Sequence, residues 1–334
     1  MSEQRSILVT GGAGYLGSKL VRRLARRSDL RVLVTDLRLP TSPVDGVAYE
    51  CLDVRDPTLA DLVAREKIDT VVHLAAMVSP GRDRELEYSV DVGGTRNVLD
   101  ACLRHGVRRL VTTSSGAAYG YCADNPRRLR EEHPLRADET FSYAWHKRLV
   151  EEVLAEARRD SPHLEQVIFR PCTILGRGVH NRITLLFDRP WLVGVSGGDD
   201  RFVLVWDEDV ARALECALDS RRTGIFNLAA DGALPMAELA RRMGKAYRPL
   251  PAWLLKVVLG VGRRLGLTDY GPEQVPFLQY RPVLDNSRLK EELGFVPEKT
   301  SSEVFALFLA DRGIKDRGLE DRGTESPEPT EPVP

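Results

Sequence analysis

The sequence predicts an α/β protein built on a doubly wound parallel sheet, with a smaller and discontinuous C-terminal lobe. Short β-branched runs alternate with longer segments of helical periodicity, and repeated strand, helix and strand units form parallel sheets. The runs lack polar alternation, which is typical of strands that helices cover on both faces. With 334 residues, 43% of them hydrophobic, the chain can bury the core that such a fold requires.

Six strands are expected in the first half of the chain. They are residues 7–10, 30–35, 47–51, 70–74, 110–113 and 166–169. Apolar spacing between them predicts helices, including one with Leu16, Leu20 and Leu24 on one face, one around 86–104 and one over 142–159.

Regular alternation stops after residues 170–171, where glycines and prolines punctuate short apolar pieces. We therefore expect a first domain over 1–171, to which 202–229 return as a strand at 202–205, a helix at 208–218 and a strand at 225–228. A second lobe is expected over 172–201 and 230–312. Residues 313–334 contain almost nothing apolar to bury, which predicts a disordered tail.

Charge and composition exclude several classes of partner. Lys plus Arg number 48 and Asp plus Glu number 49, a net charge of -1, so a nucleic-acid partner is not expected. Five cysteines without a CxxC pair and an N-terminus without an apolar leader predict a cytoplasmic protein. Six histidines show no metal-ligand spacing, so no metal site is expected.

No membrane span is expected, because the longest apolar segment, 253–261, is short and contains Lys256. Residues 251–259 begin an apolar helix that ends in Arg263 and Arg264. Packing within the second lobe is its expected role. Contact with a membrane surface and the lining of an apolar substrate pocket are the alternatives.

A glycine-rich loop follows the first expected strand and opens the first helix. It comprises Thr10, Gly11, Gly12, Ala13, Gly14, Tyr15, Leu16 and Gly17. Glycines let a backbone approach a pyrophosphate, and the helix N-terminus supplies N–H groups to it. Asp36, at the end of the second strand, suits the hydroxyls of an adenosine ribose. Its charge favours NAD over NADP, although Arg38 keeps NADP open.

Tyr143 and Lys147 have the i, i+4 spacing that places a phenol and an ammonium on one helix face. A cation near a phenol favours the phenolate, which can act as a general base. Ser115 follows the expected strand 110–113, at the carboxyl edge of the sheet where α/β folds bind ligands. The non-catalytic alternatives are that Tyr143 and Lys147 lie on a solvated helix face and that Ser115 only caps a turn.

With these motifs, the chain resembles the extended short-chain dehydrogenase/reductase family over about residues 6–310, in particular its NAD-dependent epimerase/dehydratase branch. The resemblance rests on the loop 10–17, Asp53-Val54, His73-Leu74-Ala75-Ala76, and Ser115 with Tyr143 and Lys147. It implies a Rossmann fold, a small-molecule substrate, and a homodimer formed through the helices near 86–104 and 142–159.

The same resemblance implies a role for each matched residue. Tyr143 is the acid/base, Lys147 its partner and ribose ligand, and Ser115 the catalytic hydroxyl. The implied cofactor contacts are Gly11, Gly14, Tyr15, Leu16, Gly17, Asp36, Asp53, Val54, Leu74, Ala75, Ala76, Tyr143, Lys147 and Pro171. The implied substrate contacts are Ser115, Thr173 and Arg201.

Several positions depart from the family pattern. Gly116-Ala117 replace the Asp-Glu pair of dehydratases, which disfavours dehydration. Asp91 replaces an Asn, so an amide donor becomes an acceptor. Thr173 stands where many sugar-nucleotide epimerases have Asn, Trp206 replaces a frequent His, and Arg201 is one place out of register.

Three functions are compatible with these residues. The first is an NAD-dependent epimerase that transiently oxidises a carbinol carbon of a sugar, nucleotide-linked by the resemblance. The second is an NAD(P)-dependent dehydrogenase or reductase of a non-nucleotide alcohol or ketone. The third is a non-catalytic dinucleotide sensor, against which the presence of Tyr143 and Lys147 argues.

Overall fold

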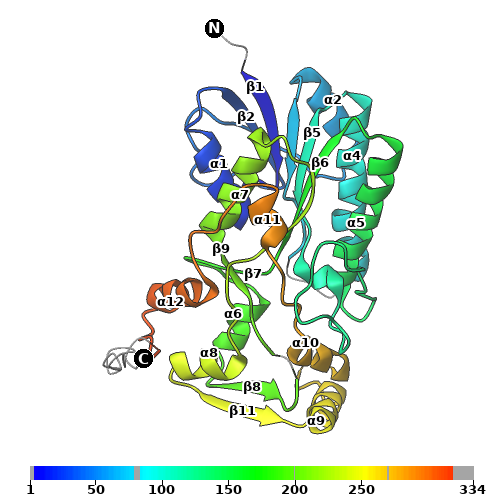
Figure 1. Cartoon of the computed structure of the whole chain (residues 1–334). Coiled ribbons are helices and arrows are strands. Elements are labelled where there is room, and N and C mark those ends of the chain that lie inside the picture. The colour runs from blue at the N-terminus through cyan, green and yellow to red at the C-terminus, as the bar shows by residue number, and fades with distance from the viewer. Residues whose placement is uncertain (1–3, 79–82, 199, 269–270, 319–334) are drawn as a thin grey trace, which may run out of the picture.

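The computed structural model describes residues 4–78, 83–198, 200–268 and 271–318. Its central sheet has seven strands in the order β10-β6-β5-β4-β1-β2-β3, and every neighbouring pair is parallel (Figure 1). The strands are β1 (Arg5–Thr10), β2 (Leu30–Asp36), β3 (Ala48–Cys51), β4 (Thr70–His73), β5 (Arg109–Thr113), β6 (Glu165–Pro171) and β10 (Gly224–Leu228). The doubly wound parallel sheet predicted from the sequence is confirmed.

Helices cover both faces of this sheet (Figure 1). One face carries α1 (Tyr15–Leu24), α7 (Asp207–Asp219) and α11 (Ser287–Glu291), and the other carries α2 (Leu59–Arg65), α4 (Gly94–Arg104) and α5 (Ser142–Asp160). Each set of helices closes a separate apolar core against the sheet. This two-sided burial explains why the strands read as unbroken apolar runs.

Two short elements shape the edge of the sheet where the site lies. Helix α3 (Arg84–Tyr88) continues through a π-helical turn, η1 (Ser89–Gly93), into α4. A 3₁₀ turn, η2 (Gly116–Tyr119), follows β5. Isolated π-helical turns are frequent at functional sites because they change the direction of side chains within a helix.

The second lobe contains two small parallel sheets, β7 (Thr173–Leu175) with β9 (Leu204–Trp206), and β8 (Trp191–Val195) with β11 (Ala246–Leu250). Its helical elements are α6 (Arg182–Phe187), α8 (Met236–Arg242), α9 (Ala252–Arg264), η3 (Pro272–Gln274), α10 (Val275–Gln279) and α12 (Ser301–Asp311). A cluster of phenylalanine rings, Phe187, Phe202, Phe305 and Phe308, is central to its core.

The expected return of residues 202–205 to the central sheet is wrong. Strand β9 pairs with β7 in a separate sheet, although its Val205 packs in the core that α1 and α7 close, and β10 pairs with β6 in the central sheet. An apolar run shows that a strand will be buried, but not which strand it will pair with.

The expectation of disorder from residue 313 is also wrong at its beginning. Ile314 packs against the second lobe's core, and Arg242 of α8 donates through Nε to Asp316 at 3.0 Å, with both side chains buried. A buried arginine thus binds a segment whose composition predicts no order. Residues 319–334 lie outside the described part of the chain.

Candidate active site

The glycine loop lies at the carboxyl end of β1, which stands between β2 and β4. The strand order runs outward in opposite directions from β1, so the loop lies at the topological switch point of the sheet. Gly11 has a φ of +70°, and a Cβ there would lie 2.6 Å from the backbone nitrogen of Ala75. A Cβ at Gly17 would lie 2.6 Å from the Cα of Gly12. Only glycine therefore permits the loop, the start of α1 and the end of β4 to approach so closely.

The N-terminus of α1 fits a phosphate group. Gly14 is the N-cap and makes no side-chain capping bond, and the first turn of α1 contains no acidic residue. The first N–H groups of a helix have no partner within it and carry partial positive charge. Asp36 stands beside the loop, where its Oδ2 accepts a hydrogen bond from the Ala13 amide at 3.0 Å. The residues present thus fit the pyrophosphate and ribose of a dinucleotide.

The Tyr15 side chain has a structural role in this arrangement. Its hydroxyl donates to the buried carboxylate of Asp207 on α7, and Lys19 Nζ lies 3.2 Å from the same carboxylate. Burial, with Asp207 beside the hydroxyl, raises the pKa of Tyr15. The hydroxyl is therefore engaged between α1 and α7. Leu16, which follows, packs against the core on that face.

Asp53 and Val54 follow β3. Arg55 binds the Asp53 carboxylate at 2.6 Å and lowers its pKa. Val54 is nearly buried, and a Cβ at Gly94 would lie 2.6 Å from its side chain. Asn97 of α4 donates to the Val54 carbonyl at 2.9 Å. The segment is thereby attached to the start of α4.

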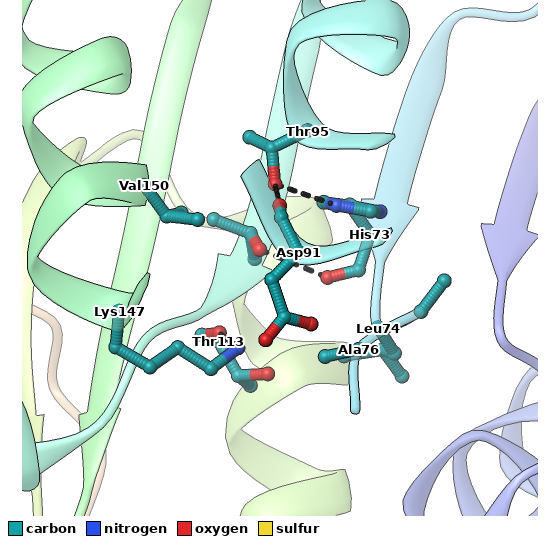
Figure 2. Close-up of a pocket in the computed structure, with 10 residues that line it drawn as sticks. His73, Leu74, Ala76, Asp91, Thr95, Thr113, Lys147 and Val150 are labelled. Carbon is teal, nitrogen blue, oxygen red and sulfur yellow. Dashed lines mark hydrogen bonds between the residues drawn. The ribbon is translucent and has the colours of Figure 1, made fainter. Parts of the chain in front are cut away.

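A small pocket gathers the matched residues 73–76 and Lys147, whereas Ser115 and Tyr143 are not among its lining residues (Figure 2). It is lined by His73, Leu74, Ala75, Ala76, Asp91, Thr95, Thr112, Thr113, Lys147 and Val150. Lys147 is buried and donates from Nζ to the Thr113 carbonyl at 3.3 Å. The same Nζ lies 5.9 Å from the centre of the Tyr143 ring. The sequence spacing thus places a cation beside the phenol at the carboxyl edge of the sheet.

Ser115 is the N-cap of η2, which packs against α5, the helix that carries Tyr143 and Lys147. Its Oγ accepts a hydrogen bond from the Ala117 amide at 3.1 Å. The hydroxyl hydrogen of Ser115 is not used by that bond, so the turn-capping role and donation to a substrate oxygen are compatible. The neighbouring Ser114 Oγ is buried and has no partner within the described residues.

His73, which lines the pocket, links three elements through hydrogen bonds. Thr95 Oγ1 donates to the Asp91 carbonyl at 2.6 Å, so it accepts from His73 Nε2 at 3.1 Å. Nδ1 of the neutral ring then accepts from Thr10 Oγ1 at 2.7 Å. Burial, with a smaller contribution from Lys147, lowers the pKa of His73 to about 3. His73 is therefore a neutral connector between β1, β4 and α4, and Thr95 extends the chain of hydrogen bonds to η1.

Asp91 keeps an acceptor's role where the family has Asn. Its Oδ1 accepts from the Met77 amide at 2.8 Å, while Oδ2 is buried, lacks a hydrogen-bond partner in the described chain and lies 3.8 Å from His146 Nδ1. Burial raises the pKa of Asp91 and lowers that of His146. No local sequence pattern pairs these residues, because the contact depends on the π-helical turn and on α5.

The second lobe contributes a half-buried cation, Arg281, that the sequence did not indicate. Arg281 donates from Nη2 to Thr173 Oγ1 at 3.4 Å, and its guanidinium lies 3.8 Å from the ring centre of Phe202. Its Nη1 is buried without a partner in the described chain, and burial lowers the pKa of Arg281 to about 10. Arg201 directly precedes Phe202. Arg281 stands between Tyr280 and Pro282, outside any recognisable motif, so its position near Thr173 could not be predicted from the sequence.

Other sequence-predicted features are located as follows. Pro171 ends β6 beside Leu228 of β10. Trp206 ends β9, under the ammonium of Lys299. Within the described residues, no group of three or more His, Cys, Asp or Glu side chains could hold a metal ion. None of the helices in that part of the chain is long and apolar enough to cross a membrane.

The glycine loop, the acidic end of β2 and the Tyr143–Lys147 pair define a dinucleotide-dependent enzyme of the short-chain dehydrogenase/reductase type. A model of the NAD dependent epimerase/dehydratase family matches residues 7–229, so the chain belongs to this family.

Similar proteins span nearly the whole chain. An uncharacterized protein of Mycobacterium tuberculosis is 28% identical over 316 residues, which cover 92% of this chain and 84% of that protein. The UDP-glucose 4-epimerase of Vibrio cholerae is 27% identical over 320 residues, 90% and 93% of the two chains. The crystal structure of Thermus thermophilus UDP-glucose 4-epimerase with NAD matches with a TM-score of 0.70 and 27% identity, covering 92% of this chain and 99% of that one.

Proposed function

We propose that this enzyme is an NAD-dependent epimerase of a nucleotide-linked sugar that acts by transient oxidation of a carbinol carbon. The observation that carries the proposal is the buried Lys147 ammonium beside the Tyr143 ring, in a pocket next to the glycine loop. The UDP-glucose 4-epimerases among the relatives support the same reaction class.

In this proposal, NAD held by the glycine loop and Asp36 would supply the hydride acceptor and donor, and the substrate ketone would turn over so that the same carbon takes the hydride back on its other face. Tyr143 takes the proton of the substrate hydroxyl and later gives it back. Lys147 stabilises negative charge on the phenol oxygen by its proximity, and its bond to the Thr113 carbonyl holds it in place. Ser115 donates its free hydroxyl hydrogen to the reacting oxygen. No net oxidation results.

Arg281 supports the nucleotide link. A half-buried guanidinium whose Nη1 is buried and has no partner within the described residues, beside Thr173 and two aromatic rings, suits a diphosphate. Arg281 would therefore supply the diphosphate contacts that are missing because Thr173 replaces an Asn and Arg201 is out of register. Asp36 favours NAD over NADP, because its carboxylate repels a 2'-phosphate.

A net dehydrogenase or reductase of a non-nucleotide substrate is the second candidate. It is favoured by the aromatic contacts of Tyr121 with Phe141 at 4.9 Å and with Phe277 at 5.1 Å between ring centres. These rings join the first domain to the second lobe, and the guanidinium of Arg281 lies 4.7 Å from the centre of the Phe277 ring. A homodimer through α4 and α5, which pack against each other on one side of the sheet, belongs to either proposal.

The first experiment is to denature freshly purified protein and quantify the released NAD and NADH against protein concentration. Near-stoichiometric NAD supports an epimerase, because a cofactor recycled in place need not leave. A protein that is empty and binds NAD reversibly favours the net dehydrogenase. Turnover is then assayed with UDP-glucose and UDP-galactose, followed by other sugar nucleotides.

The Tyr143→Phe variant tests the assigned acid/base. We expect turnover to fall by about 10²–10⁴-fold with NAD binding retained. Tyr247→Phe, in β11, removes the same atom where it bonds Asp200 at 2.8 Å, and serves as the matched control. Equal turnover by the Tyr143→Phe variant and the wild type would contradict the proposed mechanism.

A further inference from the structure

Helix α9 has one buried face and one exposed apolar face. Leu255 packs against Val195 and Val275, with Ala252 and Leu259 beside it. On the opposite side, Trp253, Val257 and Val261 follow one another at intervals of four residues and are 67%, 55% and 54% exposed. The expectation that this helix packs within the lobe therefore holds for one face only.

The exposed apolar face continues beyond the helix and is accompanied by positive charge. Leu265 and Leu267 are exposed directly after the end of α9. Lys256, Arg263 and Arg264 are exposed, and residues 251–268 contain no Asp or Glu. Arg263 pairs with Glu273 at 2.6 Å, whereas Lys256 and Arg264 make no ion pair within the described residues. Trp253, Lys256, Val257, Val261, Arg264, Leu265 and Leu267 form what we call the α9 face.

We propose that the α9 face binds peripherally to an anionic phospholipid bilayer. Helices with aliphatic and tryptophan side chains on one face and flanking basic residues lie in the plane of the membrane interface. Basic residues near an anionic leaflet strengthen that binding, and tryptophan suits the headgroup level. Figure 1 shows α9 at the outer end of the second lobe, remote from the glycine loop after β1, so the cofactor loop stays clear of the bilayer.

A second copy of the chain is a less suitable occupant. A two-fold contact would bring each α9 face against its own copy, and the unpaired Lys256 and Arg264 would then approach like charges. An anionic surface complements the same charges. The inference does not depend on the proposed epimerase activity, since the α9 face lies at the end of the second lobe that is farther from the glycine loop (Figure 1).

The test is co-sedimentation of the full chain with vesicles of phosphatidylcholine alone and of phosphatidylcholine with about one quarter phosphatidylserine. We expect sedimentation with the anionic vesicles only, weakened by 0.5 M salt because surface charges are screened. The Lys256→Gln/Arg264→Gln variant should bind about 25-fold more weakly, because each basic residue contributes about fivefold.

The Trp253→Ser/Val257→Ser variant should lose vesicle binding while unfolding at nearly the wild-type temperature, because both side chains are exposed. Val296→Ser, which removes a valine that is 58% exposed outside α9, is the matched control and should bind as the wild type does. Absence of binding to anionic vesicles, or equal binding by the Trp253→Ser/Val257→Ser variant, would overturn the proposal. So would light scattering that shows self-association abolished by that variant, which would assign the face to a second copy.

Discussion

Because the His73 ring is buried and neutral, the free energy of unfolding should depend on pH in a way that can be calculated from the structure. Its pKa is about 3 in the folded protein, against about 6.5 in an unfolded chain. Between these values the unfolded state binds one more proton than the folded state, so stability rises with pH. The contribution of His73 is complete above about pH 6.5 and is lost as the pH falls toward 3.

From pH 7 to pH 5 this loss amounts to roughly 2 kcal/mol, since each pKa unit corresponds to about 1.4 kcal/mol. The His73→Gln variant removes the titrating ring, so its free energy of unfolding should change less over this interval by that amount. Urea unfolding at pH 7, 6 and 5 measures the change for each protein.

His105→Gln is the matched control, because His105 is an exposed histidine at the end of α4. Identical pH dependence in wild type and His73→Gln would refute the reasoning. So would a titration of the His73 ring signals by NMR with a midpoint above pH 5.

Three further predictions concern the loop, the core and the cofactor. Gly17→Ala should lower the free energy of unfolding by about 1–3 kcal/mol and weaken NAD binding, because its Cβ would overlap the Gly11 carbonyl; Gly93→Ala, with open space around it, should do neither. Thermal unfolding and NAD titration decide, and unaltered affinity in Gly17→Ala would contradict the role of the loop. Glu151→Gln should cost about 3–5 kcal/mol by leaving the buried Arg170 without its partner at 2.6 Å, whereas Glu152→Gln at an exposed pair should cost under about 1 kcal/mol. Equal losses in urea unfolding would argue against that assignment. Asp36→Asn should raise the ratio of NADP to NAD affinity, and an unchanged ratio would show that the carboxylate does not select the cofactor.

Much of the first domain could be predicted from the sequence because its signals are local. Apolar runs separated by helical periodicity define a parallel sheet wherever they occur. The glycine loop is recognised from its spacing after a strand and before a helix, although the approach of Gly11 to Ala75 at the end of β4 is long-range, and the Tyr143–Lys147 pair depends only on helical spacing. Recognising these motifs needs no knowledge of distant partners.

Other parts of the molecule were decided only when distant segments met. Arg281 reaches Thr173 across 108 residues, and Asp316 meets Arg242 across 74. The pairing of β9 with β7, the contact of Asp91 with His146 and the exposure of one face of α9 likewise depend on how the second lobe and the π-helical turn pack. Composition and periodicity report what a segment can bury. Which partner it finds is determined by packing and charge complementarity in the folded chain.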